Sequence, residues 1–353
     1  MALIDVLLPV RNGMPYLRGA LDSVLAQSER DWRLLVLDHG SSDGSGALID
    51  DYAARDRRIE RIDGSAAQGL SGLLNLGLAR CDGRYMMRLD ADDLCLPERM
   101  ALTLAAFASH PAIAVVSGQA QIIDGQGSPL GQLRLPPGIT RLTAASLFRN
   151  PISHPALTVD LERIHALGAA YGRDFLSVLP PARRLQVDGL AEDYFMFGQL
   201  ALLGLCLNLP QRLIRYRWHP ANVSQQRATE QLQLSLKISR YLASCFCTMR
   251  ALPPFDPAPF CNHGGQLFEL SADPDHDKAF LHMAATLRRA LGSSLELERE
   301  LAFRHTLAQR RLPVMLLRYR RFRRRHAAET GEWHTIRSWL LRHLPGRALQ
   351  AAA

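Results

Sequence analysis

The chain has 353 residues, of which 47% are hydrophobic and 22% charged, a balance that is typical of a globular protein and excludes long disorder. Its length allows one large domain with an appendage, or two domains. The formal net charge of +8 is unevenly distributed, because residues 317–326 read LRYRRFRRRH. Such a run is either a solvated helix face or a surface for anionic partners such as lipid headgroups, nucleic acid or sugar phosphates.

The first 118 residues alternate between strand and helix patterns. We expect strands at 2–10, 32–38, 58–63, 84–90 and 112–118, and helices at 16–28, 46–56, 70–83 and 97–109. Strands separated by helices predict a parallel or mostly parallel α/β sheet. In such sheets ligands bind beyond the carboxyl ends of the strands, and Asp38 and Asp90 both fall at such ends.

The alternation weakens after about residue 119. Residues 124–138 are rich in Gly and Pro and predict a loop or hairpin. Residues 154–168 predict a strand followed by a helix, 191–204 a helix, and 205–220 a pair of strands. From about Gln226 the chain is expected to be mainly helical, which suggests a boundary there.

The cysteines and the hydropathy pattern bear on the compartment. The six cysteines form no C-x-x-C pair and several lie in apolar runs, which favours reduced thiols of a cytosolic protein over a disulfide framework or a zinc site. The N-terminus MALIDVLLPV lacks a basic region and is not expected to be a secretory signal. No run of about 18 apolar residues occurs, so no transmembrane helix is expected.

Three carboxylates follow the fourth predicted strand. Asp90, Asp92 and Asp93 lie within the stretch RYMMRLDADDLCLP, and carboxylates so close together repel one another and resist burial. A hard divalent cation, Mg²⁺ or Mn²⁺, would offset that repulsion and could bind a diphosphate leaving group. Alternatively, the stretch is a polar loop in which Asp93 caps the helix that begins near Pro97. A phosphoaspartate site is less favoured, because Leu94 and Cys95 follow instead of Thr or Gly.

Other segments hold candidate polar residues. No G-x-G-x-x-G follows the first strand, which argues against an NAD-type phosphate cradle, although a nucleotide could contact Asp38 at this edge. Glu192 and Asp193 open a predicted helix. They are either first-turn acids favoured by the helix dipole or a base that accepts a proton from an alcohol. His219 and His154 are either packed or surface residues, or ligands of a metal or phosphate.

Taken together, the ordered blocks resemble family 2 of the glycosyltransferases, which have the GT-A fold, over about residues 3–224. The blocks that carry the resemblance read IDVLLPVRNGMPYLRGALDSVLAQS, LLVLDHGSSDGS, LLNLGLARCDGRYMMRLDADDLCLPERM, HPALTVDL, AEDYFMFGQL and LIRYRWHPANVS. Several independent blocks in the right order are far more specific than any single motif.

The resemblance implies a Rossmann-like mixed sheet flanked by helices. It implies a GT-A catalytic domain over 1–225 and a helical, basic extension over 226–353. The implied reaction moves a sugar, with inversion, from a nucleotide-diphospho-sugar to an acceptor hydroxyl, and a UDP-sugar is the expected donor. A cell-surface saccharide or lipid-linked glycan is the expected acceptor. We expect a cytoplasmic protein whose basic tail contacts the inner face of an anionic membrane, and no nucleic-acid partner.

The resemblance also implies roles for individual residues. Asp193 is the implied general base, Glu192 and His154 are implied to contact the acceptor, and Asp92 and His219 are implied to hold Mn²⁺ or Mg²⁺. The residues implied to bind the nucleotide-sugar are Pro9, Val10, Arg11, Asn12, Asp38, Asn75, Arg88, Asp90 and Ala91.

The chain departs from the family pattern at two positions, His39 and Arg11. His39 replaces the second Asp of the usual Asp-Asp-Gly-Ser, and Arg11 replaces the usual aromatic residue of the first block. Both bear on how the nucleobase is bound. The Q-x-x-R-W arrangement of processive synthases is absent, so polymer extrusion is not expected. Two alternatives stay open: a nucleotidyltransferase, for which RNGMP supplies only part of a phosphate loop, and a binding or scaffold protein with a degenerate site.

Overall fold

The N-terminal apolar segments form the parallel half of one mixed sheet. The computed structural model describes residues 2–219, 227–262, 273 and 275–342. In it β3 (Ile59–Asp63), β2 (Trp32–Asp38), β1 (Ile4–Val10) and β4 (Tyr85–Arg88) lie side by side in that order. All three pairings are parallel, and Val10 is the partner of Asp38. The carboxyl ends of these strands therefore share one edge, as the alternation predicts.

The other half of the sheet mixes directions. β8 (Thr158–Asp160) lies antiparallel between β4 and β6 (Val115–Ile123), and β6 pairs in parallel with β9 (Cys206–Arg217). β7 (Pro129–Leu133) makes the expected hairpin with β6, and β5 (Leu94–Cys95) pairs antiparallel with β9.

The expectation of two strands over 205–220 is wrong. β9 is one strand of 12 residues. The register of β9 against β6 shifts between Ser117 and Ala120, opposite Pro210 and Gln211. The middle of the segment therefore forms an irregularity within one strand instead of a turn between two.

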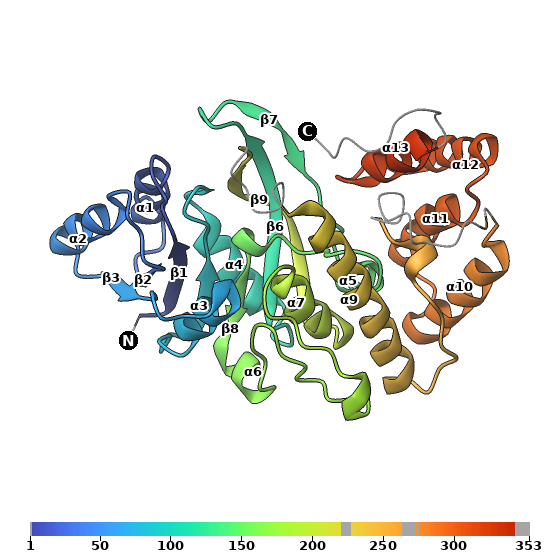
Figure 1. The fold of residues 1–353 in the computed structure, drawn as a ribbon, viewed down its shortest axis with the longest axis horizontal. Helices are drawn as coiled ribbons and strands as arrows, with labels where there is room; N and C mark the ends of the chain where they lie inside the picture. The colour runs from blue at the N-terminus through green and yellow to red at the C-terminus, as the bar shows by residue number, and fades with distance from the viewer. Residues whose placement is uncertain (1, 220–226, 263–272, 274, 343–353) are drawn as a thin grey trace.

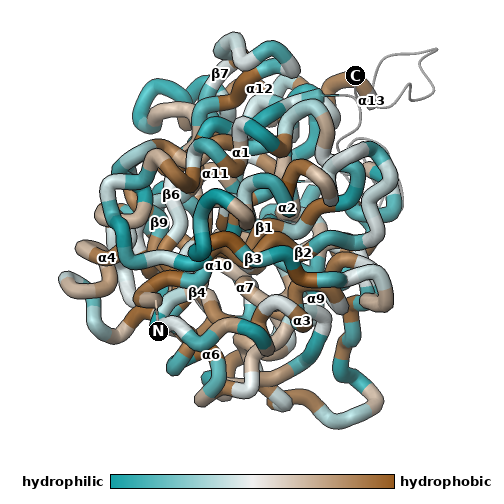
Figure 2. Tube along the Cα trace, turned by 90° about the vertical axis from the view of Figure 1, so that its left-hand side faces the viewer, coloured by the Kyte–Doolittle hydropathy of each residue, from teal (hydrophilic) through white to brown (hydrophobic). Residues whose placement is uncertain are grey.

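Helices cover both faces of the sheet (Figure 1). In β1 the side chains of Val6 and Leu8 pack into one hydrophobic cluster and Leu7 into the other, as the two-residue period of a strand requires. The first cluster includes α1 (Leu17–Leu25), α2 (Ser45–Arg55) and α4 (Arg99–Ser109). The second includes α3 (Gly69–Leu78), α5 (Ile139–Ser146), α6 (Leu161–Ala166) and α7 (Glu192–Leu202). Figure 2 shows hydrophobic segments along β1 and its neighbouring strands, between these layers.

The C-terminal part is mainly helical, as expected. Its helices are α9 (Ala228–Met249), α10 (Asp277–Leu291), α11 (Leu295–Ala308), α12 (Leu312–Arg325) and α13 (Glu332–Arg342). Buried side chains of this part, such as Phe246 and Trp339, share one hydrophobic cluster with Phe148, after α5, and Tyr194, on α7. The predicted boundary near Gln226 falls outside the described residues, and the division into two domains stays a prediction.

All six cysteines are free thiols. Among the helices of the described residues, none combines the length and the hydropathy that crossing a membrane requires.

Candidate active site

Three aspartates gather where the chain leaves β4. Asp90, Asp92 and Asp93 each offer a carboxylate oxygen, and these oxygens lie within 4.8 Å of one another. Asp93 is fully buried, whereas Asp90 and Asp92 are partly exposed. Burial, and then the charge of Asp90, raise the pKa of both Asp92 and Asp93. The cluster therefore resists full ionisation unless positive charge is close by.

Asp93 does not cap the following helix, so that interpretation is wrong. α4 begins at Arg99, six residues further on. The Asp93 Oδ1 instead accepts a hydrogen bond of 2.7 Å from the backbone N–H of Arg217, and its Oδ2 is buried without a hydrogen-bond partner among the described residues. The carboxylate thus fixes the end of β9 against the aspartate loop.

Arg217 joins this loop to a second one. Its Nε donates to the Asp92 carbonyl at 2.8 Å, and its Nη1 donates to the carbonyls of Asp124 and Gly125 at 2.9 and 3.1 Å. The guanidinium lies 4.6 Å from the ring centroid of Tyr16. Neither Arg217 nor Tyr16 is among the candidates from the sequence; the only signal was the membership of Arg217 in the block RYRWHP.

His219 reaches the cluster from the segment that follows β9. Its Nε2 lies 2.8 Å from Asp92 Oδ2, and its ring stacks at a tilt 5.0 Å from that of Tyr16. The structure thus brings together Asp92 and His219, 127 residues apart, which the sequence analysis assigns to one metal site.

Two buried arginines lie beneath the aspartates. Arg88 Nη2 forms an ion pair of 2.5 Å with Asp90 Oδ1. Arg99 Nη2 donates to the carbonyls of Arg88 and Leu157, at 2.7 and 2.9 Å. Both arginine side chains are almost completely buried. Their charges offset part of the repulsion among the carboxylates.

The loop after β1 is tied to the loop after β2. Asn12 donates its backbone N–H to Ser41 Oγ at 3.0 Å, and its side-chain oxygen accepts the Ser42 N–H at 2.8 Å. Pro9 and Val10 end the buried strand, and Arg11 is exposed. A side chain at Gly13 would have its Cβ 2.7 Å from a Val10 methyl carbon and 3.3 Å from the Leu17 Cβ, so glycine lets this loop turn closely between β1 and α1.

Asp38 already has partners in the protein. Its Oδ1 accepts the Ser41 N–H at 2.9 Å and its Oδ2 accepts from Arg61 Nη2 at 2.7 Å. Burial alone would raise the pKa of Asp38, but the hydrogen bonds from Ser41 and Arg61 outweigh it and lower that pKa. His39, the replaced carboxylate, has its Nε2 3.0 Å from the Ala67 carbonyl.

Asn75 and His154 meet at Tyr171. The Asn75 side-chain amide donates to the Tyr171 carbonyl and accepts its N–H, both at 3.0 Å. The Tyr171 hydroxyl lies 2.9 Å from His154 Nε2. Burial, followed by the charge of Arg88, holds the pKa of His154 well below its usual range, so this imidazole is neutral at pH 7.

Glu192 and Asp193, the candidate acceptor contact and base, are the first two residues of α7. Ala191, just before them, has φ 59°. Asp193 Oδ2 accepts a hydrogen bond of 2.8 Å from Asn150 Nδ2, a partner with no signal in the sequence. Burial raises the pKa of Asp193, and burial together with the Asp193 charge raises that of Glu192 to about 8. The charge of Asp90 contributes to both shifts, so these carboxylates and the aspartate loop share one electrostatic environment.

The donor set around Asp92 suits a divalent cation. Carboxylate oxygens and a neutral imidazole are ordinary ligands of Mn²⁺, and carboxylates also of Mg²⁺. The unpartnered buried oxygen of Asp93 supports the same interpretation. Beside this set, burial raises the pKa of Asp193, which makes it a stronger base than an ordinary aspartate.

Comparisons with known proteins find similarity to glycosyltransferases. Residues 5–155 match the family model described as glycosyl transferase family 2. An uncharacterized glycosyltransferase of Haemophilus influenzae is 25% identical over 248 residues, which cover 67% of this chain and 72% of that protein. An Escherichia coli protein is named UDP-Glc:alpha-D-GlcNAc-diphosphoundecaprenol beta-1,3-glucosyltransferase WfgD. It is 28% identical over 161 residues, which cover 46% of this chain and 60% of that protein.

Solved structures agree on the fold. S. aureus TarS 1-349 aligns with a TM-score of 0.50 at 13% identity, covering 91% of this chain and 90% of that one. The mannosyltransferase PcManGT from Pyrobaculum calidifontis, solved with GDP-Man and Mn2+, aligns with a TM-score of 0.50 at 18% identity, covering 96% and 85%. The expected GT-A fold with a helical C-terminal region is confirmed.

The raised pKa of Glu192 predicts how stability depends on pH. The folded state favours the protonated acid, so the free energy of unfolding falls as the pH rises from about 4.5 toward 8, by at most about 1.4 kcal/mol per pH unit for this group. Glu192→Gln keeps a neutral side chain of similar shape and removes this pH-dependent loss of stability. Urea unfolding in EDTA should show the variant gaining stability over the parent between pH 5 and pH 8. The exposed Glu60→Gln is the control, and a constant difference across this range would contradict the buried, neutral Glu192.

Proposed function

Because residues 5–155 match the model of glycosyl transferase family 2, we propose that the chain transfers a sugar from a nucleotide-diphospho-sugar to an acceptor hydroxyl with inversion. The observation that carries this proposal is the common environment of the aspartate loop and the carboxylates of α7. A leaving diphosphate needs positive charge beside it, and an attacking hydroxyl needs a base. Both requirements are met within one site.

Asp193 accepts the proton of the acceptor hydroxyl in this proposal. The hydrogen bond from Asn150 orients its Oδ2, and its raised pKa makes it a stronger base than an ordinary aspartate. Glu192 carries its own proton at pH 7, because its pKa is about 8. A protonated Glu192 contacts the acceptor as a neutral group and adds no negative charge beside the base.

Asp92 and His219 would hold a divalent cation, with Asp93 behind them, and Asp90 would lie near the ribose and diphosphate of the donor. When bound, such a cation neutralises the diphosphate as the bond to the sugar breaks. Arg88 keeps the Asp90 carboxylate in place through their ion pair. Asn12 and Asp38 lie on the neighbouring loops at the same strand edge, which supports the proposed nucleotide contact there. A UDP-sugar is the donor that we propose.

A cell-surface saccharide or lipid-linked glycan is the acceptor class that we propose, on the likeness to the named relatives. The family match disfavours a nucleotidyltransferase. The retained carboxylates, with their matched partners and raised pKa values, disfavour a degenerate scaffold.

The proposed contact with an anionic membrane rests on α12. Arg320, Arg321, Arg323 and Arg324 are exposed on this helix, as are the apolar side chains of Val314, Leu316 and Leu317. Arg318 is not part of this surface, because it pairs with Asp277 at 2.7 Å. Positive charge next to exposed apolar side chains suits an interface with anionic lipid.

Asp193→Asn should abolish turnover and spare donor binding. The amide cannot accept the proton, so we expect the release of nucleoside diphosphate from the donor to fall about 10²- to 10⁴-fold. Calorimetry should give an unchanged affinity for the donor. Asp188→Asn, an exposed change in the preceding loop, is the matched control. Unchanged turnover in Asp193→Asn would sink the assignment of the base.

Asp92→Ala should weaken cation-dependent binding of the donor. Titrations of UDP-, GDP- and dTDP-sugars, with and without Mn²⁺, measure this in the parent and the variant. We expect binding in Mn²⁺ to weaken about 10- to 100-fold in the variant and the difference between the two conditions to shrink. The exposed Asp31→Asn should behave like the parent. Binding that ignores Mn²⁺ in the parent would contradict the cation site, and no binding of any donor would contradict the proposed function.

Charge removal on α12 tests the membrane contact without disturbing the core. Deletion of residues 317–326 is unsuitable, because Phe322 is buried against α11. The triple change of Arg320, Arg321 and Arg324 to Gln should reduce sedimentation with phosphatidylglycerol vesicles by about tenfold or more, at about 1 kcal/mol for each arginine. Phosphatidylcholine vesicles are the control for charge. Equal sedimentation of parent and variant would contradict the proposed contact.

A further inference from the structure

A cavity of about 880 Å³ lies away from the candidate active site. Its walls come from β6, β7 and β9, from the segment that leads into α5, and from residues 325–329 after α12. We call it the junction pocket. None of the candidate site residues lines it, so the proposed reaction gives it no role.

The junction pocket is electropositive. Five arginines and two glutamates line it, an excess of three positive charges. The arginines are Arg134, Arg141, Arg212, Arg299 and Arg325. The charged residues behind the lining do not cancel this excess. They are two arginines, Arg149 and Arg304, and two glutamates, Glu300 and Glu332, so their charges sum to zero.

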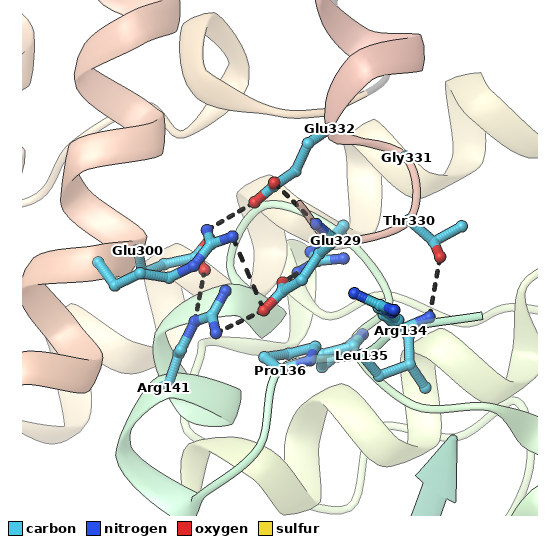
Figure 3. A network of polar contacts seen from close by, with 12 residues as sticks. Arg134, Leu135, Pro136, Arg141, Glu300, Glu329, Thr330, Gly331 and Glu332 are labelled. Atoms are coloured by element: carbon cyan, nitrogen blue, oxygen red, sulfur yellow. Dashed lines mark hydrogen bonds and ion pairs between the residues drawn. The ribbon is translucent and has the colours of Figure 1, made fainter. Parts of the chain in front are cut away.

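Two of the arginines are fixed in the wall by ion pairs, and Figure 3 shows one of them, Arg141, beside Glu329 and Glu300. Arg141 lies 2.5 Å from Glu329 and 3.4 Å from Glu300, and Arg299 lies 2.5 Å from Glu332. These contacts join α5, α11 and the segment before α13. They leave the buried Nη2 of Arg141 without a hydrogen-bond partner among the described residues, although the side chain lines the pocket. A buried guanidinium nitrogen without a partner calls for an acceptor.

The other three arginines have no carboxylate within ion-pair distance in the part of the chain that the structure describes. Among the described residues the Arg134 guanidinium donates to the Gln132 side-chain oxygen, at 3.2 Å, while Arg212 and Arg325 are exposed. Such guanidinium groups bind phosphate or carboxylate through paired hydrogen bonds.

The rest of the lining suits a sugar. Gln132 and Gln211 contribute amide groups, and Leu96, Leu102 and Leu135 contribute aliphatic surface. Amides match sugar hydroxyls, and aliphatic side chains cover the apolar faces of a pyranose ring. A site for a bare inorganic anion would not need this second kind of surface.

We propose that the junction pocket binds an anionic sugar unit, through a phosphate or carboxylate group. β9 connects the pocket to the candidate active site, because Arg212 precedes Arg217 by five residues, about 16 Å at about 3.3 Å per residue. An oligosaccharide of a few units spans that length. The ligand is therefore an acidic unit of the acceptor glycan. Its identity as part of the acceptor rests on the proposed function, whereas the existence of an anionic sugar site does not rest on it.

Binding of simple sugars tests the pocket independently of transfer. Glucose 1-phosphate, glucuronic acid and glucose are titrated into the full chain, followed by saturation-transfer NMR. EDTA and low salt keep the aspartate loop free of cations, so that it repels anions. The pocket variant is Arg134→Gln with Arg212→Gln. The control is Arg289→Gln with Arg57→Gln, which removes the same charge from exposed positions outside the pocket.

We expect an anionic sugar to bind about tenfold more tightly than glucose, and the pocket variant to lose about tenfold in that affinity while the control keeps it. Preference for glucose 1-phosphate identifies a phosphate ligand, and preference for glucuronic acid a carboxylate. Equal binding of glucose, or equal loss in both variants, would overturn the proposal. UDP-sugar binding in Mn²⁺ is measured on the same proteins. If it is absent throughout while the anionic sugar still binds, the proposed function fails and the pocket stands.

Discussion

Repulsion among the carboxylates that follow β4 is the constraint on which the rest of the site depends. Asp90, Asp92 and Asp93 cannot lie this close in a largely buried loop without positive charge and donors around them. Arg88 supplies charge from below, and Arg217 supplies donors from the end of β9. The acidic loop therefore determines where the last strand of the sheet ends, and with it the place of His219.

The second half of the site depends on a different element. Asp193 and Glu192 are presented by the first turn of α7, where the backbone N–H groups favour negative charge. Burial opposes that effect and raises the pKa of both acids. With a pKa of about 8, Glu192 is protonated near neutral pH, so the two neighbouring acids differ in environment as well as in proposed role.

Features that depend on local sequence were predictable, whereas features that depend on contacts between distant residues were not. The parallel strands, Asp38 and Asp90 at their ends, and α7 were predictable, because each depends on local periodicity and on a topological rule. The alternative in which Asp93 caps a helix was wrong, since the partner of Asp93 is Arg217, 124 residues away. β9 was taken for two strands because Pro210 and Gln211 resemble a turn, whereas β6 accommodates them by a shift of register. Asn150 and the ion pairs around Glu329 involve partners that no spacing rule connects.

Those ion pairs make the C-terminal region part of the site's support. Glu329 contacts Arg141 and Arg149, at 2.5 and 2.9 Å. The next residue, Asn150, donates its hydrogen bond to Asp193. One short segment thus binds the C-terminal region at Arg149 and the proposed base at Asn150. Loss of the Glu329 contacts would remove one restraint on the segment that orients Asp193. The basic extension is therefore mechanically continuous with the proposed catalytic centre, whatever partner its exposed arginines bind.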